Sequence, residues 1–277
     1  MKKLLVSTIT LIAVSSALVM TTSAYFSGTV TSSGNKFVAG TFDLNVTNQS
    51  FFNDGQVEGS EWEANDITNK LFFDFSNVNP GDSGVNKIVF NVPTLSYWAC
   101  ANIALTKSDE NGIGEPEEDV DDTSDGNWSG ELDDHISFML WADDGDDVDS
   151  SNEPVVKYET KERIIKQGKL STYPQGDDNI GETYIISDST QNVWASDPAS
   201  LDEDTPYFVG TAWCFGDFVI DPTTGTGLKC EVSDVTNYNN AQSDNIEGTI
   251  NLYVAQAAHN DDFVCSSWEP NQESSSE

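Results

Sequence analysis

The stretch Thr249-Ile-Asn-Leu-Tyr-Val-Ala255 decides the fold class. Every second residue from Ile250 to Val254 is a large aliphatic one, so these side chains project to one face of an extended strand. An amphipathic helix would instead repeat its apolar residues every three or four positions. The stretch therefore predicts a β-strand with one face against a core.

Runs of the same kind occur along most of the chain. They are short, rich in β-branched and aromatic residues, and separated by clusters of Gly, Asn, Asp and Pro; they cover residues 42–46, 71–75, 87–92, 98–106, 136–141, 183–186, 207–213 and 217–220. This pattern is typical of an antiparallel β-sandwich. A short helical turn around 161–166 is the one helical element that we expect. Two acidic stretches, 108–134 and 142–154, are predicted to be loop insertions.

The composition indicates a folded and strongly anionic chain. Its 277 residues include 47 acidic and 12 basic side chains and two histidines, for a net charge of −35. Such a charge repels phosphates, so nucleic acid and anionic membrane surfaces are excluded as expected partners. The 7 Trp, 8 Tyr and 14 Phe residues are too many for a disordered acidic chain, so we expect a substantial core.

Residues 1–24 have the three parts of an export signal. Met1-Lys2-Lys3 is basic, residues 4–20 are apolar, and Thr22-Ser23-Ala24 supplies small residues for cleavage. The alternative is a membrane anchor, for which the apolar run is at the short limit of about 17 residues. We expect cleavage after Ala24, no stable membrane insertion afterwards, and a secreted, extracellular or cell-surface location. Losing two lysines leaves ten basic against 47 acidic residues, a charge of −37.

The four cysteines fit an oxidising compartment. Cys100, Cys214, Cys230 and Cys265 form an even set without a C-x-x-C pair. Two disulfides are the favoured interpretation, and a zinc site, which usually has closely spaced ligand pairs, is the alternative. Four cysteines allow three pairings. We favour Cys214–Cys230, which would close a turn, and Cys100–Cys265, which would tie the middle of the chain to its end.

An acidic loop after residue 142 is a candidate calcium site. Calcium takes six to eight oxygen ligands and tolerates irregular geometry. The carboxylates that we expect to serve as ligands are Asp143, Asp144, Asp146, Asp147 and Asp149. A solvated loop is the alternative, because the strict EF-hand spacing is absent. A second, weaker candidate is the 115–125 loop. Calcium would be structural, and no other cofactor is expected.

Half of the basic residues left after signal cleavage lie between 157 and 169. This basic segment either meets an acidic loop of the same or a neighbouring molecule, or forms a solvated face. Because exposed ion pairs contribute little free energy, the solvated face is the favoured interpretation.

The segment after the signal resembles a known family. Ala24-Tyr-Phe-Ser-Gly28 leads to Phe37-Val-Ala-Gly-Thr-Phe-Asp-Leu44, and Asn79-Pro-Gly-Asp82 precedes a predicted strand. These motifs resemble the TasA–camelysin family of secreted biofilm-fibre proteins. The stretch 212–216, with 228–230 and 240–244, resembles cysteine-bearing members. The N-terminal match spans roughly residues 1–92, whereas 108–205 matches only loosely.

The resemblance implies one jelly-roll domain, here residues 37–267, that polymerises with identical subunits outside the cell. In that family the mature N-terminal segment of one subunit fills a groove in the next, which is β-strand addition between chains. The donor segment would be residues 25–36. Its strand-forming residues would be Tyr25, Phe26, Thr29, Val30 and Thr31. The alternatives are a disordered leader or an edge strand of the same molecule. Residues 268–277 are expected to be a disordered acidic tail.

No catalytic signature stands out. Camelysin members are classed as metallopeptidases, but this sequence has no H-E-x-x-H, and His135 and His259 lie far apart. It also lacks a G-x-S-x-G elbow. The leading hypothesis is therefore a non-enzymatic, secreted structural subunit of an extracellular fibre. A monomeric, calcium-stabilised cell-surface or matrix binding protein is the second hypothesis. A secreted hydrolase with a carboxylate pair is the third.

Overall fold

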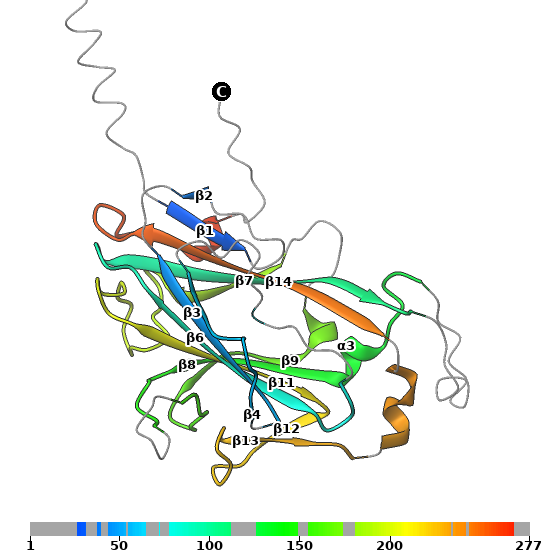
Figure 1. Ribbon diagram of the computed structural model, residues 1–277. Coiled ribbons are helices and arrows are strands. Elements are labelled where there is room, and N and C mark those ends of the chain that lie inside the picture. The colour runs from blue at the N-terminus through cyan, green and yellow to red at the C-terminus, as the bar shows by residue number, and fades with distance from the viewer. Residues whose placement is uncertain are drawn as a thin grey trace, which may run out of the picture.

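The computed structural model describes residues 27–31, 38–39, 44–53, 55–64, 72, 78–111, 126–148, 155–173, 181–233, 235–241 and 244–268, with backbone alone at 27–31, 38–39 and 235–237. Two antiparallel β-sheets lie face to face, with a small third sheet below them in the view of Figure 1. The predicted all-β antiparallel sandwich is confirmed. The jelly-roll connectivity stays a prediction.

The first sheet has five strands. In spatial order they are β10 (Glu182–Ser187), β7 (Tyr97–Asp109), β14 (Asn245–Gln256), β1 (Ser27–Thr31) and β2 (Val38–Ala39). All of its neighbouring pairs are antiparallel.

The second sheet has seven strands. Its path is β4 (Gly55–Gln56), β3 (Asn45–Phe52), β6 (Ser83–Asn91), β11 (Tyr207–Phe215), β8 (Ile136–Asp143) and β9 (Arg163–Lys169), with β5 (Trp62–Ala64) also paired to β3. The third sheet is the hairpin of β12 (Asp217–Ile220) and β13 (Leu228–Glu231). The helical elements are short: α3 (Leu132–His135), η1 (Leu170–Thr172), η2 (Val235–Ala241) and η3 (Cys265–Ser267).

The main core lies between the two large sheets, as the alternation in β14 predicts. Val254 is fully buried there, and Ile250 and Leu252 pack against the same cluster. Phe90 of β6 and Ile186 of β10 belong to this cluster too, so both sheets contribute aliphatic and aromatic side chains. Burial on this scale is the main favourable term in folding, at about 25 cal/mol for each Å² of apolar surface.

Each large sheet is also covered on its outer face. On the first sheet a second cluster joins Trp98 and Ala255 to Phe263 and the Cys100–Cys265 disulfide, and Trp268 stacks on Tyr253. On the second sheet a third cluster packs around Trp141. The two disulfides join Cys100 to Cys265 and Cys214 to Cys230, the pairing favoured from the sequence. The described residues contain no free cysteine.

The short helical turn predicted around 161–166 is found only in part. The chain turns at 159–162, where the Glu162 N–H donates to the Glu159 carbonyl at 2.9 Å, but residues 163–166 belong to strand β9, which pairs with β8 along most of its length. Pairing with a neighbouring strand outweighs the weak local helical preference, as β-branched Ile164 and Ile165 favour a strand. The export signal, most of the 71–75 run and the tail after Trp268 lie outside the described residues.

Candidate functional site

The N-terminal strand β1 lies along the edge of β14 in the same molecule (Figure 1). Its five residues pair in order, from Ser27 opposite Ala255 to Thr31 opposite Asn251. On its other side β1 pairs with the two-residue strand β2, where Gly28 lies opposite Ala39. The first strand that follows the expected cleavage site therefore sits between β14 and a very short outer strand.

Strand β14 depends on β1 for only part of its hydrogen bonding. Its other edge pairs with β7 over its whole length, from Asn245 to Gln256. Pairing with β1 covers residues 251–255 alone. If β1 left, β14 would present an unpaired edge of five residues, and such an edge is a template for a strand from another chain.

An apolar pocket lies beside β14, between the sheets. It is lined by Leu44, Phe90, Ala99, Cys100, Ile186, Leu252, Tyr253 and Val254. Leu252 and Val254 are the β14 residues whose register partners in β1 are Val30 and Gly28. Backbone pairing along the β14 edge is one of the features on which strand addition relies.

The predicted donor segment is thus partly described. Residues 27–31 form a strand, which includes Thr29, Val30 and Thr31, whereas Tyr25 and Phe26 lie outside the described residues. In the structure β1 pairs with β14 of the same molecule, which corresponds to the alternative of an edge strand. Transfer of the strand between chains stays a prediction.

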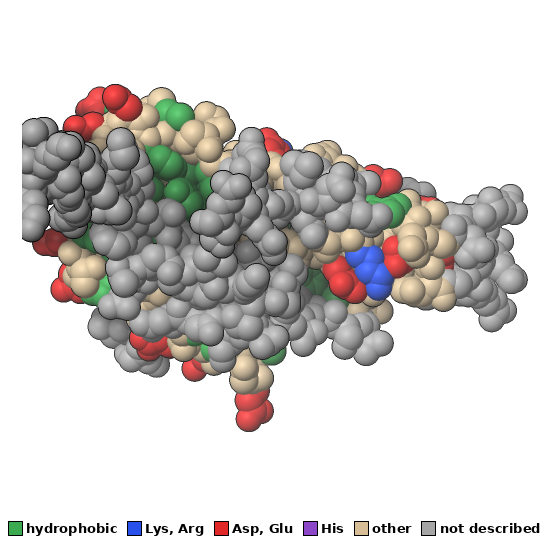
Figure 2. Space-filling model, turned by 90° about the horizontal axis from the view of Figure 1, so that it is seen from above, with side chains coloured by type: hydrophobic (Ala, Val, Ile, Leu, Met, Phe, Trp, Pro, Cys, Tyr) green, Lys and Arg blue, Asp and Glu red, His purple; other side chains and the backbone are tan. Residues whose placement is uncertain are grey.

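The surface seen from above, on the side where Figure 1 places β1 and β2, has mixed character (Figure 2). Acidic side chains are spread along the edges of this view, a group of hydrophobic side chains lies toward the upper left, and one Lys/Arg group lies among acids toward the right.

The predicted calcium loop is divided into two acidic groups. Asp143 and Asp144 meet Glu162, and their carboxylate oxygens lie within 4.8 Å of one another. Asp144 also meets Asp146 and Glu159 within the same limit. Asp147 pairs with Lys157 at 3.8 Å. Asp149 and the 115–125 loop lie outside the described residues.

The sequence interpretation missed Glu159 and Glu162. They precede β9, and the antiparallel pairing of β9 with β8 brings them to the acidic loop. The same pairing brings in the basic segment. Lys161 Nζ lies 2.8 Å from Asp144, 2.9 Å from Asp146 and 2.8 Å from Glu159. Farther along the segment, Lys166 pairs with Glu182 and Lys169 with Asp217, each at 2.8 Å. The favoured interpretation of this segment as a purely solvated face is wrong, because its lysines meet acids of the same molecule.

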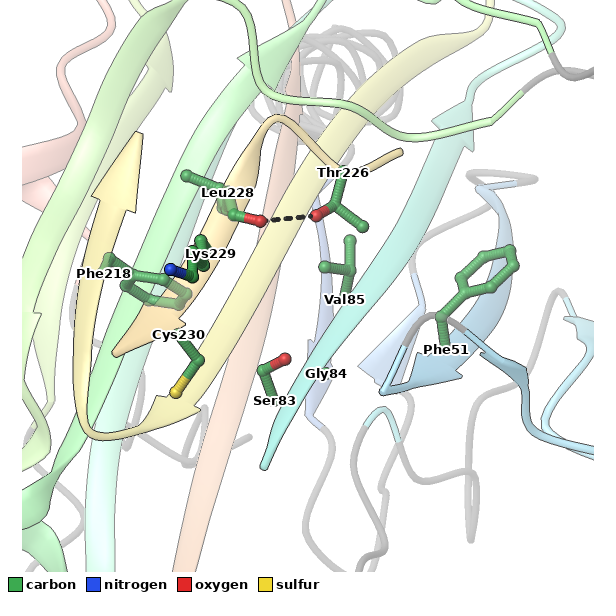
Figure 3. A pocket seen from close by; sticks show the side chains of 9 residues that line it. All are labelled: Phe51, Ser83, Gly84, Val85, Phe218, Thr226, Leu228, Lys229 and Cys230. Carbon is green, nitrogen blue, oxygen red and sulfur yellow. Dashed lines mark hydrogen bonds between the residues drawn. The ribbon is translucent and has the colours of Figure 1, made fainter. Parts of the chain in front are cut away.

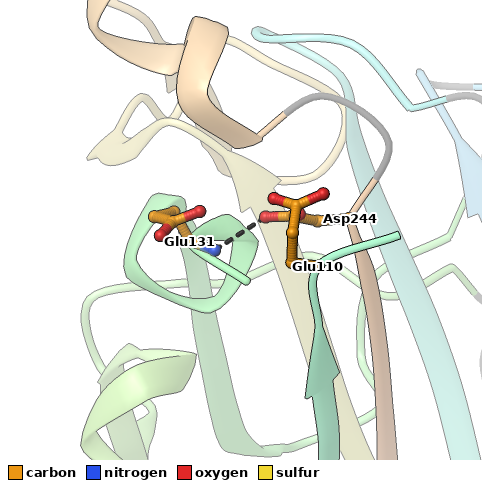
Figure 4. Close-up of side chains that lie close together, drawn as sticks. All are labelled: Glu110, Glu131 and Asp244. Atoms are coloured by element: carbon orange, nitrogen blue, oxygen red, sulfur yellow. Dashed lines mark hydrogen bonds between the residues drawn. The ribbon is translucent and has the colours of Figure 1, made fainter. Parts of the chain in front are cut away.

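A third acidic group lies where β7, β14 and α3 meet (Figure 4). Asp244 Oδ2 accepts hydrogen bonds from the backbone N–H groups of Glu131, at 2.7 Å, and Leu132, at 3.0 Å. The Glu110 side chain lies beside the Asp244 carboxyl. Burial, followed by the charge of Glu110, raises the pKa of Asp244 to about 7, although the two backbone N–H groups oppose the shift. Asp244 therefore holds its proton more tightly in the folded chain than in the unfolded one.

Replacing Asp244 by Asn should remove the free-energy cost of ionising a buried carboxyl group, a cost that grows with pH. A carboxyl whose folded pKa is raised contributes stability that is fully present below about pH 4 and is lost as the pH rises through about 7. The free energy of unfolding of D244N should match that of the parent chain near pH 4 and exceed it by about 1–2 kcal/mol at pH 8, a figure reduced for partial solvent screening. Urea unfolding across this pH range measures the difference. A difference independent of pH would refute the assignment.

A small pocket lies beside the β12–β13 hairpin (Figure 3). Its lining comprises Phe51, Ser83, Gly84, Val85, Phe218, Thr226, Leu228, Lys229 and Cys230. Lys229 pairs with Glu231 at 2.8 Å, and Cys230 is held in a disulfide. His135 is not among the residues that line this pocket. Its Nε2 lies 2.9 Å from Asn240 Oδ1, and its ring packs near the ring of Tyr238.

Comparisons with protein-family models, with curated proteins and with solved structures find no match to this chain. Within the part of the chain that the structure describes, no helix is long and apolar enough to cross a membrane. The two disulfides are of the kind that persist in oxidising compartments.

Proposed function

We propose that this protein is an exported structural subunit that polymerises into extracellular fibres by exchange of its N-terminal strand. One observation carries the proposal: β1, which begins at the third residue after the expected cleavage site, lies on the β14 edge, bordered on its outer side by the two-residue strand β2. In a fibre, the same strand of a neighbouring subunit would pair with this edge. The resemblance to TasA–camelysin proteins supports the same assembly.

The energetics of β1 suit exchange. A five-residue strand forms few backbone hydrogen bonds, and each contributes a net of about 1 kcal/mol. Release of β1 would break only the pairing of its five residues with β14 and of two of them with β2, while both disulfides and the core cluster between the sheets stay in place. The exposed edge is then satisfied again by an identical strand from another chain, so the fibre restores the backbone pairing that each subunit gives up on releasing β1.

Exchange of this kind leads to an open filament. The donor strand and the β14 edge are different surfaces of one subunit, so each subunit can give to one neighbour and receive from another. Such a head-to-tail contact does not close on itself unless the rotation between subunits forms a ring. Within one chain the strand is tethered beside its own edge, so exchange requires a high subunit concentration.

The charge of the exported chain should control when the fibre forms. With ten basic residues against 47 acidic ones, and with lysines of the basic segment already paired internally, stacked subunits repel one another. We expect residues 25–277 to form filaments that become longer and more numerous as salt is added, since salt screens this repulsion. Negative-stain electron microscopy and light scattering across a KCl series measure the effect. Filaments that form best at low salt in chelator would contradict it.

A further inference from the structure

A buried carboxylate lies at the end of β8. Asp143 is 2% exposed, and its Oδ1 accepts a hydrogen bond from the Gly145 N–H at 2.7 Å. Its Oδ2 is buried and has no hydrogen-bond partner among the described residues. Because a buried charged oxygen without a protein partner is costly, this atom is expected to contact a cation, a water molecule or a proton.

The residue is held firmly in place. Trp194 Nε1 donates a hydrogen bond to the backbone carbonyl of Asp143 at 2.9 Å. Gly145, with a φ of 70°, packs so closely on Phe208 that a Cβ would lie 2.7 Å from the ring. A glycine is therefore needed in the turn that follows Asp143. These contacts fix the carboxylate before any ligand arrives.

Two more carboxylates complete the group. Glu162 is oriented by the backbone, because its Oε1 accepts from the Asp144 N–H at 3.0 Å and its Oε2 from the Glu159 N–H at 2.7 Å. Oxygens of Asp143, Asp144 and Glu162 lie within 4.8 Å of one another. Oxygens in one calcium coordination shell, each about 2.4 Å from the ion, lie at most about 5 Å apart. The spacing fits a single ion.

The neighbouring lysine does not supply this charge directly. Lys161 forms ion pairs with Asp144, Asp146 and Glu159, and no ion pair joins Lys161 to Asp143 or Glu162 among the described contacts. Of the three carboxylates in the proposed site, Asp144 pairs with Lys161, whereas Asp143 and Glu162 form no ion pair among the described contacts.

We propose that Asp143, Asp144 and Glu162 bind a calcium ion, while Lys161 continues to neutralise Asp146 and Glu159. The donor set is all oxygen and contains neither His nor Cys, which favours calcium over zinc or copper. Water and backbone oxygens would complete the coordination. The ion would join the end of β8 to the turn before β9. This inference is independent of fibre assembly.

Binding can be measured on residues 25–277 in high KCl, which suppresses weak binding to the other carboxylates. Terbium serves as a luminescent calcium analogue, because Trp194 contacts Asp143 and can sensitise it. Calorimetry with CaCl2 gives the affinity and stoichiometry. D143N removes the buried ligand with little change of shape, E162Q removes the second, and D146N, in the lysine-paired group, is the matched control.

We expect one terbium ion to bind to each chain, and we expect calcium to displace it more readily than magnesium does. D143N and E162Q should each weaken binding at least about tenfold, whereas D146N should change it less than about threefold. In chelator D143N should melt no lower than the parent chain, and calcium should raise the melting temperatures of the parent and of D146N much more than that of D143N. If D143N does not fold, E162Q tests the proposal in its place: its calcium affinity should fall at least about tenfold, compared with less than about threefold for D146N. Absence of stoichiometric binding, or equal loss in D143N and D146N, would overturn the proposal.

Discussion

Deleting residues 25–36 should abolish filament formation while leaving a folded chain. These residues include β1, whose described contacts are backbone pairing with β14 and β2, whereas both disulfides and the core between the sheets lie outside the segment. The truncated chain keeps the β14 edge but has no strand to donate. Electron microscopy and sedimentation should detect no polymer at any salt concentration at which the parent chain assembles.

A peptide distinguishes loss of the donor from loss of folding. A synthetic peptide of residues 25–36 should bind the truncated chain, because its β14 edge is open, and should bind the self-paired parent much more weakly. A finer comparison uses proline, which cannot donate a backbone hydrogen bond. V30P lies within the five paired residues and should block assembly, whereas S33P lies beyond them and should not. Filaments from the truncated chain would refute the donor assignment.

Loss of the Cys100–Cys265 disulfide should cost more stability than loss of Cys214–Cys230. The first bridge spans 165 residues and the second spans 16. In the chain-entropy description, these separations correspond to about 5 and about 3 kcal/mol of restriction on the unfolded chain. Since a typical domain has only about 5–15 kcal/mol of net stability, C100A/C265A should be close to its unfolding limit.

The surroundings of the long bridge increase this effect. Cys100 and Cys265 are buried, and the Cys265 N–H donates to Asp188 Oδ2 at 3.0 Å. The bridge holds residues 257–268 over the outer face of the first sheet. Guanidinium unfolding of C100A/C265A and of its matched counterpart C214A/C230A gives the two free energies. An equal or larger loss in the second variant would contradict this account.

Much of the fold could be predicted from local patterns. The alternation in 249–255 identified a strand and its buried face, and residues 217–220 form a strand as expected, because both signals lie within a few residues. Strand β9 was missed because its structure depends on pairing with β8. Strand β7 likewise extends to Asp109 because β14 continues to pair with it beyond a shift in register between Glu247 and Gly248.

The acidic sites were predictable only in part. The sequence identified the carboxylates of 143–147, which are adjacent along the chain. It gave no indication that Asp143 would be buried or that Glu162 would join it, because both facts depend on the β8–β9 hairpin and on Trp194. Asp244 and Glu110, far apart in sequence, meet only because β14 pairs with β7. Contacts of this kind require the three-dimensional pairing of strands.

The most direct test of strand exchange uses two variants that each carry one added cysteine beside the two native disulfides, so that the added thiol has no partner within its own chain. In T29C the new thiol lies in β1, and in Y253C it lies at the register partner in β14. Directly opposed residues in an antiparallel pair have Cα atoms about 4.5–5.5 Å apart, which is within the range that a disulfide spans. The control replaces Y253C by Q167C, an exposed position on β9 of the other large sheet. Filaments assembled from an equal mixture of T29C and Y253C should yield covalent dimers on mild oxidation, and the mixture with Q167C should not. Filaments in which T29C and Y253C crosslink no more than the control would show that β1 stays in its own subunit and would contradict the proposed assembly.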